Sequence, residues 1–449
     1  MTFAIPTAGA IYSILGNNNS LVPMAIKDIA NSTGLTAGSY ITGDKLEGKD
    51  RFLDEFGTQA IWLFGIPVYK KLMDYTMYKA LKIDPTFDVR NLSKNRSKLF
   101  EKSIEYADSS IKESMIKASK NPKYTKNLAM TKFIVSTALT IASYAGLTKY
   151  RHYKTKQDAE KEILAEMSKE KNNKKQNSDT FSYTTPTSEA FANLKLKKQT
   201  TFTGSIQDFM YNPVKNLMIL DGAITAERLA ESRNKQELLG YTIKEGSVWL
   251  FMYFASKPIQ KFLENAAEKN KEKPASIDLD ARVIESEELK EAFENGKLAE
   301  SSKKVLSLKN HEELLDFMHN NPDDFVVQMA KKSDILPTLK NATQNDNIDY
   351  RKYIDFDEFK GVAEKLDKLK NKFEEFKQAN VKEKTLDAFL NNVKKLKRRS
   401  ILKNMGACIG ALGILAPALM IAFRKFDKDN NAFQVKEDLK KELQAKGKI

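Results

Sequence analysis

The chain has 449 residues, of which 41% are hydrophobic and 30% charged, and its mean hydropathy is −0.50. These averages exclude a transporter that lies mostly in lipid; they fit a soluble helical protein or a membrane protein with large polar segments. The net charge of +15 comes mainly from lysine. Because recognition of bases relies on arginine, this charge favours an anionic lipid surface as a partner, and no nucleic acid is expected.

The N-terminal stretch does not have the pattern of a cleaved secretory signal. Met1 to Leu15 is apolar, but no basic region precedes it, and the first positive residue is Lys27. A single cysteine, Cys408, lies inside an apolar run. The chain therefore cannot form an intrachain disulfide or a cysteine-based zinc site.

The only two tryptophans lie in nearly the same tetrapeptide, Ile-Trp-Leu-Phe at 61–64 and Val-Trp-Leu-Phe at 248–251. An acidic residue follows an apolar turn ahead of each, at Asp28 and at Asp221. The pairing predicts that one structural unit occurs twice in the chain. The alternative is two unrelated helices that both have aromatic residues suited to an interface.

The two tryptophan segments are short for membrane spans. Phe56 to Tyr69 has fourteen uncharged residues and Gly246 to Ser256 has eleven, whereas a span needs about 20. Tryptophan prefers the level of the lipid headgroups, so spanning and interfacial placement both stay open. Trp62 and Trp249 are predicted to anchor or pack these helices.

Phe133 to Thr148 is an uncharged run of sixteen residues, slightly short of a span. Ala138, Ala142 and Gly146 repeat at every fourth position. This spacing brings small side chains to one face, where helix backbones can approach closely in lipid.

A polar segment divides the chain. Lys154 to about Gln199 is rich in Lys, Asn, Ser and Thr, and such a composition cannot bury enough apolar area to offset the entropy of ordering. We therefore predict a first helical membrane unit at 1–153, a linker at 154–199 and a second unit at 200–449. The second unit has the larger polar insert, at about 265–400.

The second insert has helical signals of its own. Asn310, followed by Glu313, predicts a helix N-terminus. Apolar residues then recur at spacings of three and four from Phe359 to Phe376. This stripe predicts a long helix or helical hairpin, and an ordinary core-facing helix is favoured over an intermolecular coiled coil.

Asn404 to Phe423 is the strongest membrane signal, with twenty residues and no charge. Gly406 and Gly410 form GxxxG, so this run is predicted to pair with the run at 133–148. The alternative is a buried core helix. Basic residues precede the run, and we predict that they contact lipid headgroups: Lys394, Lys395, Lys397, Arg398 and Arg399.

Motifs for catalysis or for metal and cofactor binding are absent from the sequence. His311 and His319 lack the HExxH spacing, and His152 lies in a basic flank. No P-loop, dinucleotide or hydrolase-elbow pattern occurs. We therefore predict no catalytic, cofactor or metal site and no enzymatic activity.

The sequence predicts an all-α, membrane-associated protein with two loosely repeated halves, each made of an aromatic helix, a polar helical insert and a transmembrane-like helix. The leading hypothesis is a membrane-anchored structural or scaffolding protein whose inserts bind a protein partner; a homo-oligomer is compatible with it. The alternatives are a transporter or channel built from the repeat and a soluble helical binding protein. An acid from Asp221, Glu227 or Glu245 inside the membrane would favour transport.

Overall fold

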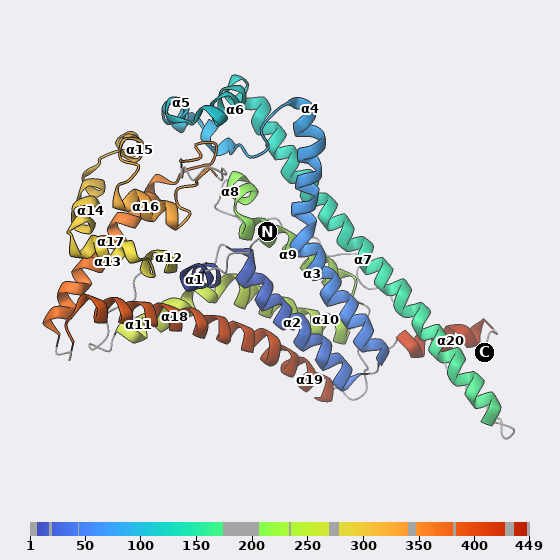
Figure 1. The fold of residues 1–449 in the computed structure, drawn as a ribbon. Helices are drawn as coiled ribbons and strands as arrows, with labels where there is room; N and C mark the ends of the chain where they lie inside the picture. The colour runs from blue at the N-terminus through green and yellow to red at the C-terminus, as the bar shows by residue number, and fades with distance from the viewer. Residues whose placement is uncertain are drawn as a thin grey trace.

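The chain folds into helices (Figure 1), and the predicted all-α class is confirmed. The only other regular feature among the described residues is an isolated bridge between Thr338 and Ile348. The computed structural model describes residues 7–17, 20–43, 45–173, 206–232, 235–268, 278–339, 347–379, 383–426 and 435–446.

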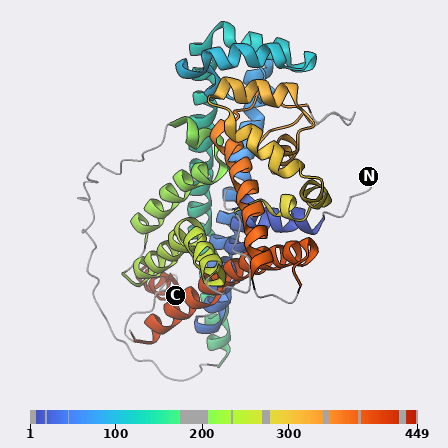
Figure 2. The same ribbon diagram turned by 90° about the vertical axis from the view of Figure 1, so that its left-hand side faces the viewer.

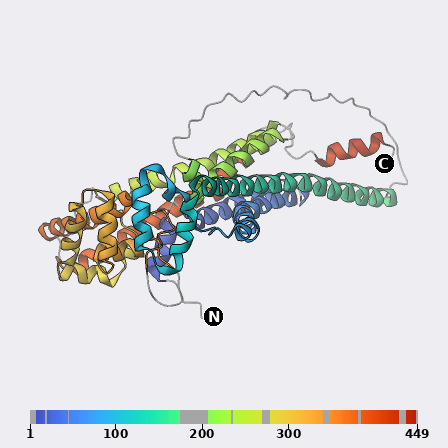
Figure 3. The same cartoon turned by 90° about the horizontal axis from the view of Figure 1, so that it is seen from above.

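An elongated group of helices, here called the bundle, forms one part of the molecule (Figures 1 and 3). Its helices pack along one another in the order α7, α3, α2 and η5–α19, with α9 and α10 across them. The bundle contains α2 (Leu21–Thr42), α3 (Lys45–Met73), α7 (Pro122–Asn173), α9 (Pro213–Ala230), α10 (Lys235–Val248), η4 (Trp249–Phe254), α18 (Leu386–Gly410), η5 (Ala411–Leu415) and α19 (Ala416–Phe426).

Local sequence explains where these helices begin. The Ser20 hydroxyl accepts a hydrogen bond from the Val22 amide at the start of α2, and Asn212 caps α9 ahead of Pro213. Both are residue types preferred at these positions. The Trp249 segment continues α10 as π-helix.

A second group of helices, here called the polar domain, surrounds a conventional hydrophobic core. Figure 2 shows it at the end of the molecule where α5 and α6 lie. Its helices are α5 (Ser97–Tyr106), α6 (Ser109–Lys120), α12 (Ala281–Ile284), α13 (Glu287–Glu294), α14 (Lys297–Ser307), α15 (His311–Asn320), α16 (Phe325–Lys332) and α17 (Phe356–Gln378).

Two predictions for the second insert are confirmed. The Asn310 side chain accepts a hydrogen bond from the Glu313 amide at 2.9 Å and so caps α15. The apolar stripe from Phe359 to Phe376 lies on α17 and packs into the core of the polar domain, mainly against α14. The stripe is therefore a core-facing one, as the sequence favours.

Shorter elements connect and extend these two groups. α20 lies beside the far end of α7 (Figure 3), where Leu439 and Leu443 pack on Ala159 and Ile163. The elements are α1 (Ala8–Gly16), η1 (Asp74–Tyr78), α4 (Lys79–Leu81), η2 (Val89–Leu92), η3 (Lys94–Arg96), α8 (Ile206–Tyr211), α11 (Ser256–Glu268) and α20 (Val435–Ala445).

The predicted linker begins inside a helix. α7 continues to Asn173, nineteen residues past Lys154, and residues 174–199 lie outside the described part of the chain. The order of elements in each half is a helical hairpin, then polar helices, then a long helix. That order is the one a repeat would produce, and the repeat itself stays a prediction.

Candidate functional site

The helices of the bundle bury charged and polar residues beside a small apolar core, and they expose large apolar residues on their outer faces. On α2, the inward side chains of Lys27, Asn31 and Ser32 are almost fully buried. No charged side chain of α2 is exposed, and the exposed positions are Val22, Ile29, Thr33, Ala37, Tyr40, Ile41 and Thr42. This is the reverse of the pattern of a helix on the surface of a soluble protein.

The Trp62 helix, α3, has the same inverted pattern. Phe52, Phe64 and Val68 are exposed, with 63% of Phe64 accessible, whereas Asp54 and Glu55 are buried. Residues 52–69 expose no charged side chain. At 1.5 Å per residue this uncharged outer face is about 27 Å long.

The Trp249 helix repeats the pattern on the other side of the bundle. Leu239, Leu250 and Phe254 are exposed, while Lys244 and Glu245 are buried. In the polar domain the distribution is the usual one: among the described residues, no large hydrophobic side chain between 263 and 401 is exposed, and on α5 and α6 only Ile116 is. Exposed apolar side chains combined with buried charged ones therefore distinguish the bundle from the polar domain.

Asp54 of α3 is the centre of a buried ion-pair network. Its Oδ1 lies 2.8 Å from Arg151 Nη1 of α7 and 3.2 Å from Arg228 Nη2 of α9. The Tyr241 hydroxyl donates to Asp54 Oδ2 at 3.4 Å and accepts a hydrogen bond from Arg151 at 3.1 Å. Four helices are thus joined around one carboxylate.

Two further pairs extend this network toward η4. Lys244 Nζ lies 2.6 Å from Glu55 Oε2, and Arg228 Nη1 lies 2.5 Å from Glu245 Oε1. Asp50 accepts a hydrogen bond from Thr155 at 2.6 Å. Ionised groups removed from water are stable only when such partners surround them, so the network fixes how the helices pack.

A cavity of about 30 Å³ lies beside this network and has room for about two water molecules. Asp221 accepts a hydrogen bond there from the Tyr253 hydroxyl, and Trp62 lines the same cavity. The cavity is lined by Asp28, Glu55, Thr58, Trp62, Asp221, Ile224, Arg228, Lys244, Glu245, Val248 and Met252. Both tryptophan-associated acids, Asp28 and Asp221, therefore meet at one cavity.

Lys27 faces a different part of the interior. Its Nζ donates to Ser256 Oγ at 3.1 Å, and the same oxygen accepts from Asn404 Nδ2 at 3.0 Å. Cys408 is fully buried next to these groups. This cluster joins α2, α11 and α18 by polar contacts inside an apolar bundle.

The predicted small-residue faces point away from the rest of the chain. Gly146, Gly406 and Gly410 have no atom within 4 Å of the place where a Cβ would stand, and Ala138 and Ala142 are exposed. α7 packs on α3, while η5 and α19 pack on α2. The predicted pairing of 133–148 with 404–423 is thus replaced by packing of each run on the α2–α3 hairpin.

Different glycines form the close contacts, and they were not predicted from the sequence. A Cβ at Gly34 of α2 would lie 2.2 Å from the Gly413 carbonyl oxygen of η5. A Cβ at Gly57 or Gly65 of α3 would lie 2.8 Å or 2.6 Å from Leu147 or Thr140 of α7. Gly57 and Gly65 are eight residues apart, a spacing that could have signalled a common face.

The remaining predicted residues lie in two places. Trp62 is buried beside the cavity, and Trp249 is half-buried with its indole donating to Thr225 at 3.2 Å. The basic residues lie on α18 next to the polar domain. Lys395 and Arg399 are exposed, Lys394 and Lys397 are half-buried, and Arg398 forms a bidentate pair with Glu285 at 2.7 Å.

Two described helices are long and apolar enough to cross a membrane, in α7 and in α18–α19. A core helix of a soluble protein can pass the same test, but such a helix is mostly buried. Here 39% and 22% of the two apolar windows are buried. No group of His, Cys, Asp and Glu side chains suited to a metal ion occurs in the part of the chain that the structure describes.

No protein-family model matches this chain, and neither a curated protein nor a solved structure matches it.

Proposed function

We propose that the protein is a membrane-embedded helical scaffold. The bundle lies in the bilayer, and the polar domain is held at the membrane surface, where it presents helices to a protein partner. The single observation that supports this proposal most is the inverted distribution of side chains in the bundle. In lipid, apolar residues face outward and ionisable residues face the interior or a cavity.

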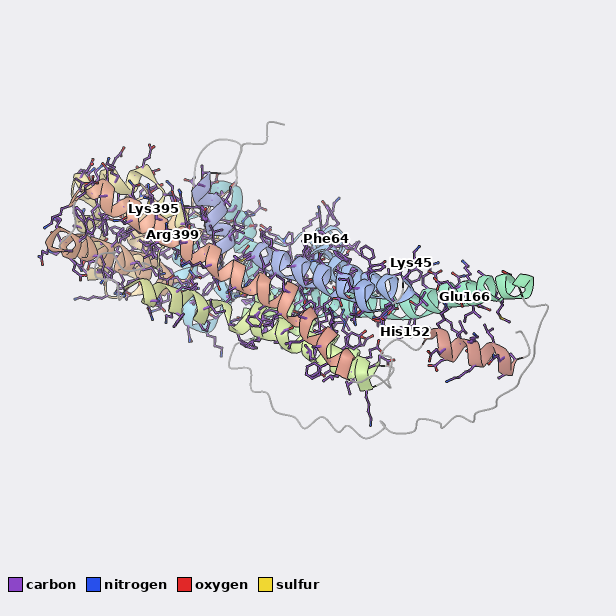
Figure 4. All side chains as sticks on the ribbon, turned by 90° about the horizontal axis from the view of Figure 1, so that it is seen from below. Lys45, Phe64, His152, Glu166, Lys395 and Arg399 are labelled. Carbon is purple, nitrogen blue, oxygen red and sulfur yellow. The ribbon has the colours of Figure 1, made fainter. Side chains whose placement is uncertain are left out.

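The dimensions of the bundle also support the proposal. The uncharged outer face of α3 is about 27 Å long, close to the hydrocarbon thickness of about 30 Å. Figure 4 places Phe64 between two charged regions, with Lys395 and Arg399 on one side and Lys45 and Glu166 on the other. Charged ends with an apolar middle are the arrangement expected for a protein in a bilayer.

Alkaline carbonate extraction of native membranes tests the location. The protein should stay in the pellet after extraction, because its apolar face is in contact with lipid. Release of the protein into the supernatant would contradict the membrane location and would favour the alternative of a soluble helical binding protein.

Thiol labelling places the bilayer on the bundle. In a Cys408→Ser background, Phe64→Cys should stay unreactive toward a polar maleimide in leaky vesicles, because lipid covers it and a thiol in hydrocarbon does not ionise. The matched variant Glu300→Cys, on an exposed site of α14, should react. Rapid labelling at both sites would contradict the proposal, since Phe64 is exposed when lipid is absent.

A second candidate function is transport coupled to protons or another small cation. The observation that favours it is that Asp221 and Glu245 line the cavity in the interior of the bundle. Ionisable residues inside a membrane usually mark a path for substrate or ions. In proteoliposomes with an imposed pH gradient, this candidate predicts a proton flux that the Asp221→Asn variant loses.

A further inference from the structure

The charges that line the cavity do not balance. Four carboxyl groups face it, from Asp28, Glu55, Asp221 and Glu245, but only two basic side chains, from Arg228 and Lys244. Both bases are already occupied: Lys244 pairs with Glu55 and Arg228 pairs with Glu245. Asp28 and Asp221 form no ion pair with a described basic side chain within 4.0 Å.

An unbalanced pair of carboxylates is costly in this interior. Asp28 comes from α2 and Asp221 from α9, and the two groups interact across the cavity. Two like charges in an apolar bundle lose hydration and repel one another, and a buried carboxyl group then takes up a proton instead of staying charged. The pair should therefore titrate as a unit.

The surroundings favour a proton over a metal ion. Asp221 already accepts a hydrogen bond from Tyr253, and among the described residues no group of His, Cys, Asp and Glu side chains is arranged to hold a metal ion. Apart from the charged side chains and Trp62, Thr58 is the polar residue on the lining. The cavity has room for water that can move a proton between the two carboxyl groups.

We propose that Asp28 and Asp221 form a proton-binding site that loads and releases protons through the cavity. The inference deepens the transport candidate by naming the bound species. The binding itself does not depend on a membrane location, so it can be tested on the full-length protein in detergent.

Trp62 is a built-in reporter of this site, because its indole lines the same cavity as Asp28 and Asp221. In the Trp249→Phe variant it is the only tryptophan, and its emission can be followed from about pH 5 to pH 10. We expect one transition centred above about pH 6, where solvated carboxyl groups have already lost their protons. Asp221→Asn should abolish the transition, and Asp28→Asn should shift or abolish it.

The control variant is Asp357→Asn, whose side chain is 88% exposed on α17; it should leave the transition unchanged. Tyr253→Phe should move the transition to higher pH, because it removes a donor that stabilises the ionised carboxylate. A transition that survives in both Asp28→Asn and Asp221→Asn would overturn the proposal. So would a midpoint that moves with sodium concentration, which would assign the site to a metal cation.

Infrared spectroscopy of the unmodified protein tests the same proposal if the asparagine variants fail to fold. The unmodified protein at neutral pH should show the carbonyl stretch of a protonated carboxyl group, and the band should vanish at alkaline pH. Absence of such a band at neutral pH would overturn the proposal. If carbonate extraction released the protein from membranes, that outcome would count against the membrane scaffold alone. It would not affect the evidence for proton binding at Asp28 and Asp221.

Discussion

Single residues in the bundle interior hold several helices at once. Asp54 is the clearest case, because it contacts Arg151, Arg228 and Tyr241 from three other helices. Removing one member of a buried ion-pair network leaves its partners as uncompensated charges, which is strongly destabilising. Replacing the whole network by apolar residues would change the free energy of unfolding much less. The network is therefore sensitive to single changes although its net stabilisation is modest.

Replacing Asp54 with alanine should lower the free energy of unfolding by about 3–5 kcal/mol, because it leaves two buried guanidinium groups without their shared carboxylate. Chemical or thermal unfolding in detergent measures the change. Asp357→Ala, at an exposed site, should alter stability by no more than about 0.5 kcal/mol. Equal effects at the two sites would contradict the assigned role of Asp54.

At the scale of helices, a glycine-to-alanine change should have opposite effects on stability in two kinds of place. It should destabilise a close contact between backbones and stabilise a helix whose small-residue face is open. Gly34 packs against the Gly413 carbonyl, while Gly406 has open space around it. Both glycines lie inside helices, where alanine is intrinsically better by about 1 kcal/mol. At Gly34 the contact with the Gly413 carbonyl, and not the helix propensity of alanine, decides whether the change stabilises or destabilises the protein.

Gly34→Ala should destabilise the bundle by about 1–3 kcal/mol, since the new methyl group forces α2 and η5 apart. Gly406→Ala should be neutral or stabilise by up to about 1 kcal/mol. Melting temperatures of the two variants give the comparison. If both changes stabilised the protein, the close approach of α2 and η5 would be absent.

The docking of α20 on α7 should depend on pH. Hydrogen bonds from Lys156 and Lys446 lower the pKa of Glu442 to about 2 from its ordinary value of 4.5. Of these two bonds only the one from Lys156 joins α20 to α7, so its share of the pKa lowering stabilises the docked state at pH values where Glu442 is ionised. That contribution is lost as the pH falls from about 4.5 to about 2.

Fluorescence anisotropy of a dye on Ala445→Cys, in a Cys408→Ser background, should fall over this pH range as α20 loosens. Glu442→Gln should already lower the anisotropy at neutral pH. Glu437→Gln, on the same helix, is the control and should not. Leu439 and Leu443 also hold α20, so part of the docking should persist in acid.

The sequence allowed the all-α fold, the α15 cap and the two apolar runs in α7 and α18–α19 to be predicted, because each depends on local pattern. It did not reveal α2, α3 and α10 as helices with apolar outer faces. Hydropathy averages all sides of a helix, and inward residues such as Lys27, Asp54 and Lys244 hide the outer face. Which residue faces inward depends on tertiary packing, which no local window contains.

The candidate site was partly visible in the sequence. Asp221 and Glu245 were singled out as acids whose burial would favour transport, and the structure places both at the cavity. The pairing of Asp54 with Arg151 and Arg228 could not be predicted, because these residues are 97 and 174 positions apart in the chain. Only the packing of α3, α7 and α9 brings them together.

The whole molecule combines two kinds of helical packing that suit different solvents. The polar domain buries nearly all of its large apolar side chains, while the bundle, which has a small apolar core, also exposes many of them and buries charge. One chain with both patterns is expected at a boundary between lipid and water. One substitution can therefore distinguish the two solvents, because it should lower the yield of folded protein if the bundle lies in lipid and raise it if the bundle lies in water.

Phe64→Lys should reduce the amount of folded protein recovered from membranes, because a lysine at mid-membrane costs about 2.5–3.5 kcal/mol. Quantified membrane and soluble fractions measure this outcome. In a soluble protein the same change would replace an exposed phenylalanine and improve solubility. A higher yield of soluble, folded protein would therefore contradict the scaffold proposal.

The 52 residues of α7 have a consequence for the geometry of any partner complex. At 1.5 Å per residue the helix is about 78 Å long, more than twice the thickness of the hydrocarbon layer. It passes the polar domain near one end and holds α20 near the other (Figure 3). With the bundle in a bilayer, α7 would extend as one continuous helix into the water on both sides. A partner of the polar domain and a partner of α20 would then bind on opposite sides of the membrane, at a separation that the length of α7 fixes.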